Sequence, residues 1–522
     1  MKQDTGTTRL VVIGLDALDP HLVAEWAEAG YLPTLQKLRR GSLMGGVENP
    51  FLLESGGCWQ AFETGMSPAK TGLYDSSRYF NAQTYREDAY LPEDRPMLAL
   101  WEQLSRAGKT CAVIDAPYML PARILNGIQI VDRSPHIPAG SGSVMRFSTQ
   151  PPELKDEILE LFGPDPGDSM PSGFLLVDPV KSAQAFVDIC RARTQNKTDL
   201  MLHCLKKQKW DFFFGVIGEA HGSGHHLWSI HDPAHPNHRP EILEKIGDPM
   251  LHIYQEIDRA VQRLLDAADE DAVTIVYLSH GMGPNYNGTF LLDRLLARIE
   301  GRQVPDKAGQ GVQLARAAWR RIPPKLRRKL RPVRRAFYND GFLLNRQERK
   351  FFEVIGSDRV GGVRINLKGR EAHGMVEPGR EYDELCETIT KELLEVRKVP
   401  SGVPLAARVI KTHDYYEGRA LDRLPDLLVE WNREGPIIEV ESPTLGRLSR
   451  KGLSGARSGD HHPNGQFFAV GPGIQPRQLN GMVHAMDFAP TIAAILGVEL
   501  EEVDGVPIPA MTEPVLATLD AD

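Results

Sequence analysis

The stretch AVTIVYLSHGMGP (272–284) decides the fold class and raises the first question about function. Its apolar run predicts a buried β-strand, which ends abruptly in Ser279-His280-Gly281. A histidine in this place leaves the strand at its carboxyl end, where open α/β sheets bind their ligands. His280 is therefore either a chemically active residue or the polar end of a core strand, and the rest of the chain must decide between them.

Strand-like runs and helical patterns alternate along the chain. The run TRLVVIGLDA (8–17) predicts a buried strand that ends in Asp16, and the amphipathic pattern over 248–270 predicts a helix. Further strands are predicted at 111–117, 211–219, 273–280, 426–431 and 466–474. Because alternating strands and helices fold as a parallel sheet covered on both faces, we predict an α/β protein, an α/β/α sandwich around a mostly parallel sheet with helical insertions.

Two regions interrupt the alternation and predict insertions. Residues 135–205 are punctuated by Pro, Gly and Ser and then become helical, which is typical of an insertion near a site. Residues 300–360 are basic and predict a helical insertion or cap. The remaining segments, 1–299 and 361–522, are then expected to form one core.

The basic region contains one concentrated stretch, Arg316–Arg335, with ten Lys/Arg and no acidic residue. Its apolar residues recur at spacings of three and four, which predicts an amphipathic helix interrupted by Pro323-Pro324. Such a helix is able to bind an anionic surface or a partner, and a solvated face folded over the core explains it equally well.

Composition places the chain among ordinary globular proteins. Of its 522 residues, 41% are hydrophobic and 25% charged, and 61 Lys+Arg against 69 Asp+Glu give a formal net charge of −8. This balance offers no basis for a nucleic-acid reader. The five cysteines lack CxxC spacing, and the chain shows no cleavable signal pattern and no apolar run of the ~18 residues that a spanning helix needs. These features predict a cytoplasmic protein with reduced thiols.

Histidines and carboxylates concentrate beside two predicted strands. GEAHGSGHHLW (218–228) follows one strand and contains Glu219, His221 and His225, while SGDHHPNG (458–465) precedes another and contains Asp460 and His461. Neutral imidazoles and anionic oxygens held by stiff elements are the donors that a divalent transition metal requires. The spacing therefore predicts a metal site, with a pair of solvated loops as the alternative.

Several blocks follow one another in an order that is known from a protein family. They are VVIGLDALDP (11–20), ESGGCWQAFETGMSPAKTGLYD (54–75), EAHGSGHHLW (219–228), SHGMG (279–283), SGDHHPNGQFFAVGPGI (458–474) and VHAMDFAPTIAAILGV (483–498). In these blocks the chain resembles the alkaline phosphatase superfamily, in particular its type I phosphodiesterase/nucleotide pyrophosphatase branch of the bacterial, cytosolic type. The resemblance spans nearly the whole chain outside the two insertions.

The resemblance implies an alkaline-phosphatase-like fold and a metal-dependent phosphohydrolase or phosphotransferase. The substrate would be a small phosphate ester or a nucleotide, cleaved at a phosphate ester, pyrophosphate or phosphodiester bond. One or two divalent ions would serve as cofactor, with zinc preferred to manganese or magnesium. A catalytically altered or inactive binding protein on the same fold is the alternative.

The resemblance also implies a nucleophile. Family members carry a Thr or Ser ten residues before the Gly of a Thr-Gly pair, and counting back from Gly65 leads to Ser55, with Trp59 where the family often has an aromatic residue. Gly56 follows the serine, so the backbone is able to approach a substrate oxyanion at a helix amino terminus. A serine hydroxyl needs a base or a metal to become a good nucleophile.

Two positions depart from the family pattern. Where the family has Asp-His-Gly, this chain has Ser279-His280-Gly281, and where the family has Asp four residues before a His, it has His221 before His225. Two of the usual metal carboxylates are therefore replaced. We interpret the change as a rebuilt metal centre, because imidazole is itself a competent ligand, and loss of metal binding is the alternative.

The resemblance thus implies two ligand sets. The first set is His221, His225 and His461. The second is Asp16, His280 and the oxygen of Ser55, helped by Ser279, Glu54 or Glu219, and Asp460 is a further nearby carboxylate able to supply charge. Gly56 and Trp59, close to the nucleophile, are predicted substrate-binding residues. Asn285 and Arg364 are further candidates from their places in the sequence; turn chemistry explains Asn285 equally well, and ordinary charge on a strand edge is the favoured explanation of Arg364.

Overall fold

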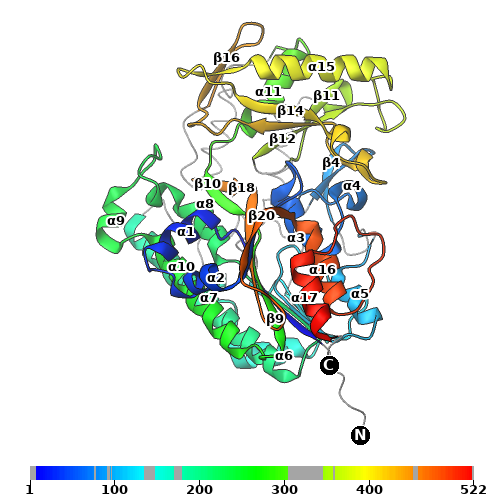
Figure 1. Ribbon diagram of the computed structural model, residues 1–522. Helices are drawn as coiled ribbons and strands as arrows, with labels where there is room; N and C mark the ends of the chain where they lie inside the picture. Colours follow the sequence, from blue (N-terminus) through cyan, green and yellow to red (C-terminus); the bar gives the residue numbers. More distant parts are fainter. Residues whose placement is uncertain are drawn as a thin grey trace. The chain divides into compact units, whose positions relative to one another are not determined.

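The computed structural model describes residues 8–75, 78–90, 95, 97–134, 147–169, 179–303, 345–356, 359–450 and 457–519. The chain folds into two compact units, and Figure 1 labels many of their helices and strands. Unit 1 comprises Met1–Ser77, Tyr90–Asn285 and Gly455–Asp522, and unit 2 comprises Arg78–Ala89 and Tyr286–Ser454. Each unit has a hydrophobic core of its own.

A nine-stranded sheet forms the centre of unit 1, in the order β20-β2-β19-β9-β1-β8-β5-β6-β7. Its strands are β1 (Arg9–Leu15), β2 (Leu43–Glu48), β5 (Cys111–Ile114), β6 (Gly127–Val131), β7 (Ser148–Gln150), β8 (Phe212–Ile217), β9 (Ala272–Leu278), β19 (Asn464–Val470) and β20 (Arg477–His484). The strands from β9 to β6 run parallel, as do β2 and β20, whereas β19 and β7 are antiparallel to their neighbours.

Helices cover both faces of this sheet. One face packs against α1 (Pro20–Glu28), α2 (Pro33–Gly41), α6 (Leu154–Phe162), α7 (Pro179–Lys207), α8 (Glu219–His231), α9 (Pro240–Ile246) and α10 (Pro249–Ala267). The other packs against α3 (Glu54–Thr64), α5 (Leu100–Arg106), α16 (Phe488–Ile495) and α17 (Pro509–Leu519), and the short α4 spans Pro68–Thr71. Side chains alternate along β1, so Val11 and Ile13 enter the first core and Leu10 and Val12 the second.

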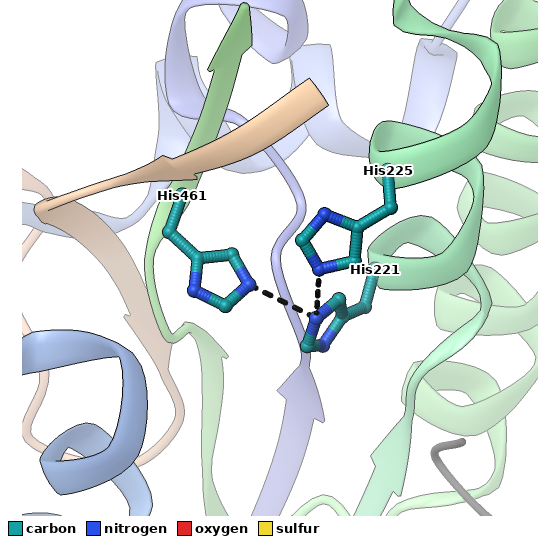
Figure 2. A group of neighbouring side chains, drawn as sticks. All are labelled: His221, His225 and His461. Atoms are coloured by element: carbon teal, nitrogen blue, oxygen red, sulfur yellow. Dashed lines mark hydrogen bonds between the residues drawn. The ribbon is translucent and has the colours of Figure 1, made fainter. Parts of the chain in front are cut away.

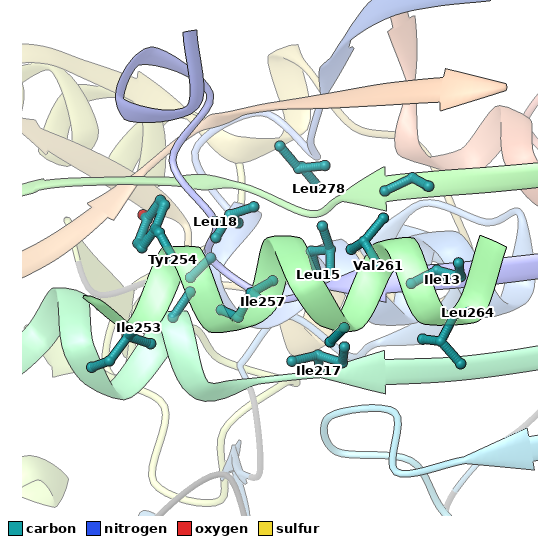
Figure 3. Close-up of a cluster of buried hydrophobic side chains, with 14 of the residues drawn as sticks. Ile13, Leu15, Leu18, Ile217, Ile253, Tyr254, Ile257, Val261, Leu264 and Leu278 are labelled. Carbon is teal, nitrogen blue, oxygen red and sulfur yellow. The ribbon is translucent and has the colours of Figure 1, made fainter. Parts of the chain in front are cut away.

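Helix α10 shows how the local sequence builds the first of these layers. Asp248 caps its amino terminus by accepting hydrogen bonds from two backbone N–H groups, and Pro249 occupies the first turn. Its buried residues recur every three or four positions, so one face of the helix is apolar. Figure 3 shows Ile257 and Val261 from this face among side chains of β1, β8 and β9, including Leu15.

A two-stranded antiparallel ribbon extends the carboxyl end of β9. It joins β10 (Gly281–Pro284) to β18 (Gly459–His462), so that Met282 lies opposite His461. Because β10 begins directly after His280 and β18 leads into β19, this ribbon brings two distant parts of the chain to one end of the sheet.

Unit 2 is built around a four-stranded antiparallel sheet in the order β11-β12-β15-β14. Its elements are β3 (Arg78–Asn81), β4 (Arg86–Ala89), α11 (Thr289–Ile299), β11 (Phe351–Val354), β12 (Val360–Ile365), α15 (Arg380–Glu395), β13 (Arg397–Val399), β14 (Ala406–Lys411), β15 (Leu427–Trp431), β16 (Glu439–Ser442) and β17 (Gly446–Ser449). Helices α11 and α15 supply Leu292, Leu296, Ile389 and Leu393 to its core.

The nine-stranded sheet and its two helical layers confirm the predicted α/β fold. The sequence predicts that residues 361–522 share one core with residues 1–299. In the structure, residues 361–454 belong to unit 2 and do not join the main sheet. The predicted strand at 426–431 forms β15, but it pairs antiparallel in unit 2. Local apolarity predicts a strand without specifying its sheet, which explains the difference.

The two predicted insertions fall partly outside the described residues. Of 135–205, the structure describes an edge strand of the main sheet, β7, and the long helix α7, so this region contributes to the core of unit 1. Of the basic region, residues 304–344 lie outside the described part of the chain, and with them the whole of Arg316–Arg335. Within the described residues, no helix combines the length and the apolarity required to cross a membrane.

Candidate functional site

The functional candidates gather where three parallel strands end. Strand β1 lies between β8 and β9, and its last residue, Leu15, is level with Ile217 and Leu278. Asp16 therefore follows β1 at the place where α8 begins after β8 and where His280 follows β9. Carboxyl ends of parallel strands form the usual ligand-binding edge of an α/β sheet, and this edge carries the predicted residues.

Three histidines converge at this edge, as Figure 2 shows. His221 and His225 lie one turn apart on α8 and therefore on the same helix face, and His461 comes from β18. The Nε2 atom of His221 lies 2.7 Å from Nε2 of His225 and 2.9 Å from Nε2 of His461. All three side chains are buried. We call these residues the three-histidine cluster.

Hydrogen bonds orient two of these rings. Nδ1 of His221 lies 2.8 Å from Oδ2 of Asp16, and Nδ1 of His225 lies 2.9 Å from the carbonyl oxygen of Gly459. Oxygen atoms of a carboxylate and a carbonyl accept hydrogen bonds, so both Nδ1 atoms carry the proton and donate. In neutral rings the Nε2 atoms then present lone pairs, which are directed at each other.

Burial keeps two of the rings neutral. Burial, with the guanidinium of Arg457 and the ring of His221 nearby, holds the pKa of His225 well below its ordinary value. Burial and the nearby ring of His280 lower the pKa of His461 in the same way. Neutral imidazole is the form that binds a metal.

The backbone makes room for this arrangement at Gly459. A Cβ atom at this position would lie 2.0 Å from the carbonyl oxygen of Gly224, so only glycine allows β18 to approach α8 this closely. The same approach places the Gly459 carbonyl against Nδ1 of His225. Glycine is therefore required here to bring His461 to the two histidines of the helix.

Asp16 is surrounded by hydrogen-bond donors. Its Oδ1 accepts from Nε1 of Trp59 at 2.7 Å and from Oγ of Ser279 at 3.0 Å, while Oδ2 contacts His221 as described above. His280 is buried beside it, with Nε2 3.7 Å from Asp16 Oδ1. Asp16, His221 and His280 form a second group whose ligand atoms lie within 4.8 Å of one another.

Two other predicted carboxylates, Glu219 and Asp460, have partners outside the two ligand groups. Glu219 is buried at the start of α8 and pairs with Lys197 at 3.5 Å and Arg193 at 3.9 Å, both from α7. Asp460 is buried, and its Oδ1 accepts a hydrogen bond from the backbone N–H of His461 at 3.0 Å. Neither carboxylate belongs to the two groups that combine three potential metal ligands in the described residues.

Four residues predicted to act in catalysis or substrate binding lie outside the three-histidine cluster. Ser55 and Gly56 lie in the first turn of α3, where the structure describes their backbone alone. Trp59 is buried in the core, and its Nε1 donates to Asp16. Arg364 belongs to unit 2, where it is buried against Glu371 at 2.7 Å, because an unpaired buried guanidinium would be costly. The contact of Arg364 in the structure is this ion pair with Glu371.

Arg457 is a site residue that the sequence did not predict. Its Nη2 donates to Nε2 of His225 at 3.1 Å and to Oδ1 of Asp460 at 3.4 Å. Asn285, predicted as a substrate contact, donates from Nδ2 to the carbonyl oxygen of Arg457 at 3.1 Å. The only signal in the sequence is a cationic residue four positions before His461, which is too common to carry a prediction.

Comparison with known proteins now adds to this geometry. The family model for type I phosphodiesterase/nucleotide pyrophosphatase matches residues 10–459. The chain belongs to this family. The match confirms the resemblance found in the sequence blocks, and it assigns the chain to a family of hydrolases that cleave phosphate esters.

Solved structures give a weaker likeness. A structure of murine ectonucleotide pyrophosphatase/phosphodiesterase 5, an inactive variant in complex with AMP, is 11% identical, with 95% of this chain and 97% of that chain covered and a TM-score of 0.49. A second structure of the same murine protein is 12% identical, with the same coverage and TM-score. A search of curated proteins gave no match.

The residues of this phosphodiesterase-family chain fit a divalent metal ion. Three Nε2 atoms converge, and the acceptors on Nδ1 of His221 and His225 are a carboxylate and a carbonyl, which commonly orient metal-binding histidines. One proton shared by Nε2 of His221 and Nε2 of His225 would remove the repulsion between their lone pairs. The same proton would not also remove the repulsion between Nε2 of His221 and Nε2 of His461. A metal ion is shared by all three nitrogens, so the donor set favours it.

Proposed function

We propose that this phosphodiesterase-family protein is a metal-dependent phosphohydrolase or phosphotransferase of small phosphate esters or nucleotides. The three-histidine cluster would hold a divalent ion, for which zinc is the preferred candidate because all three donors are imidazoles. The observation that carries the proposal is the convergence of three buried Nε2 atoms, two of them in rings oriented through Nδ1.

The chemistry would divide between the ion and the protein. A bound divalent ion would act as a Lewis acid on phosphoryl oxygens and favour ionisation of a nearby hydroxyl. The protein keeps His225 and His461 neutral through burial, so both are available as ligands. Asp16 accepts a hydrogen bond from Nδ1 of His221. This hydrogen bond makes Nε2 of the same ring more basic and therefore a better ligand for a cation.

Ser55 is the nucleophile in this proposal. The segment that contains it is attached to the ligand-binding edge on both sides. Before it, Asn49 donates from Nδ2 to the carbonyl oxygens of Ser279 and Pro463, each at 2.7 Å. After it, Trp59 binds Asp16. In the first turn of α3, backbone N–H groups without intrahelical partners favour an anion, as the attack of a serine on phosphorus requires.

The test combines metal analysis with turnover. Purified protein supplied with zinc should retain about one ion per chain or more and should hydrolyse an aryl phosphate monoester or diester. Ser55→Ala should lose turnover by a factor on the order of 10³ or more while it keeps its metal.

The control is Ser67→Ala. Ser67 also lies at the start of a helix, but its backbone N–H donates to Asp504, which is not a site residue. Ser67→Ala should retain both properties. Wild-type turnover in Ser55→Ala would place the nucleophile elsewhere. A protein that retains no metal and shows no turnover would instead be a binding protein on the same fold.

A further inference from the structure

Arg457 lies at the edge of the three-histidine cluster and reaches solvent. Its Nη2 donates to the buried Nε2 of His225 at 3.1 Å and to Oδ1 of Asp460 at 3.4 Å. Its side chain is 39% exposed, whereas that of Asp460 is fully buried. The guanidinium therefore connects a buried nitrogen of the cluster to the solvent-exposed surface.

The backbone of Arg457 is held in place from two directions. Nδ2 of Asn285 donates to its carbonyl oxygen at 3.1 Å, and the backbone N–H of Asn285 donates to Ser458 at 2.8 Å. Ser458 in turn donates its N–H to the carbonyl oxygen of His225 at 2.8 Å. The arginine is thus attached both to the end of β10 and to α8, which carries two of the histidines.

We infer that Arg457 is a substrate-binding residue that recognises the phosphoryl group, an inference that rests on the proposed function. A guanidinium stays charged and offers a planar set of donors that matches phosphate oxygens. Because Arg457 lies within hydrogen-bond distance of a nitrogen of the cluster, an anion attracted to the cluster also meets this cation. Asn285 acts as a positioning residue through the Arg457 backbone, which replaces its predicted role as a direct substrate contact.

A second consequence separates this role from a structural one. Nε2 of neutral His225 has one lone pair, and it accepts either an N–H of Arg457 or a metal ion. The two positive groups therefore compete for the same nitrogen. Removal of the guanidinium should weaken phosphate binding and at the same time leave metal binding unchanged or stronger, whereas general damage to the site would weaken both.

The experiment measures binding, so it does not depend on turnover. Inorganic phosphate is titrated by calorimetry into zinc-loaded wild type, Arg457→Ala and Arg457→Lys, and zinc affinity is measured by competition with a chromophoric chelator. We expect Arg457→Ala to weaken phosphate binding by roughly tenfold or more, since a charge-assisted hydrogen bond is lost. Arg457→Lys should recover part of this loss. Arg447→Ala, at an exposed arginine of unit 2 paired with Glu441, is the control and should change neither property.

The outcomes distinguish this inference from the proposed function. Phosphate binding that is equal in wild type and Arg457→Ala overturns the inference, as does the absence of phosphate binding in the wild type. A parallel loss of zinc and phosphate affinity also overturns it, because the arginine would then only support the site. Arg457-dependent phosphate binding in a protein that hydrolyses no ester would support the inference and refute the proposed hydrolase.

Discussion

The three-histidine cluster and the Asp16 carboxylate are neighbours that share His221, but they are built in opposite ways. In the cluster, three nitrogens converge and two of the rings present lone pairs. Asp16 is instead surrounded by the N–H of Trp59, the hydroxyl of Ser279 and the N–H of His221. The first arrangement brings nitrogen lone pairs together, whereas the second surrounds a negative charge with donors.

The difference bears on how the family pattern has changed in this chain. The resemblance places an aspartate where His221 and Ser279 stand, and both replacements touch Asp16. Ser279 contributes a hydroxyl donor where a second carboxylate would repel the first, and His221 contributes a ring that uses Asp16 as its acceptor. We therefore expect the first ligand set to bind metal strongly and Asp16 to act mainly by orienting His221.

The largest effect should come from His221→Ala, because this ring belongs to both regions. We expect the protein to retain well below one zinc per chain and to lose on the order of 10³-fold or more in turnover. The measurements are elemental analysis and hydrolysis of an aryl phosphate. His226→Ala is a close control, because the ring of His226 packs against Phe186. Full metal retention in His226→Ala together with metal loss in His221→Ala would support metal binding by the three-histidine cluster. Retention in both variants would break the comparison.

Asp16→Asn tests whether the carboxylate orients a ligand or binds metal directly. The amide keeps the shape but removes the charge, so an orienting role predicts zinc affinity weaker by roughly 10–100-fold at unchanged stoichiometry. A direct ligand of a second ion would instead change the stoichiometry from two ions to one. Chelator competition gives the affinity, and elemental analysis of both proteins gives the number of ions.

Ser279→Asp restores the family carboxylate and should introduce repulsion beside Asp16. At an effective dielectric of ~20, two charges 4 Å apart interact by about 4 kcal/mol before screening. We expect a lower Tm without metal and recovery when metal is added. The more negative centre should also lower the preference for a dianionic monoester over a monoanionic diester, measured as a ratio of kcat/KM.

A control for this variant is Ser279→Asn, which has similar size and no charge. The same Tm for both variants, with and without metal, would show that charge at this position is unimportant. An unchanged ratio of monoester to diester hydrolysis would show that it does not set substrate preference.

The smallest effect should come from Trp59→Phe, which removes one donor to Asp16. The loss of a hydrogen bond to a charged acceptor predicts destabilisation by about 1.5–3 kcal/mol, in addition to the cost of the smaller ring, measured by urea unfolding. Trp101→Phe is a matched control, because this fully buried indole has no hydrogen-bond partner at Nε1 among the residues that the structure describes. Equal destabilisation of the two variants would contradict the importance of the contact with Asp16.

Much of the fold was open to prediction because it depends on local patterns. Apolar runs that end in polar residues predicted β1, β8 and β9, and the i, i+4 spacing of His221 and His225 already places both rings on one helix face. The family blocks then pointed to His461. These features involve short segments, in which periodicity and residue type determine the structure.

The sequence by itself thus determined the α/β architecture, the edge of the sheet that carries the candidate site, and the identity of its histidines. The tertiary structure alone decided which atoms meet there. The pairing of β10 with β18 brings His461 to α8, and burial directs Trp59 to Asp16 and Arg364 to an ion pair in unit 2. The tertiary structure also places Arg457 beside His225. The physical reason is that contacts between residues hundreds of positions apart depend on strand register and close packing, which local periodicity does not specify.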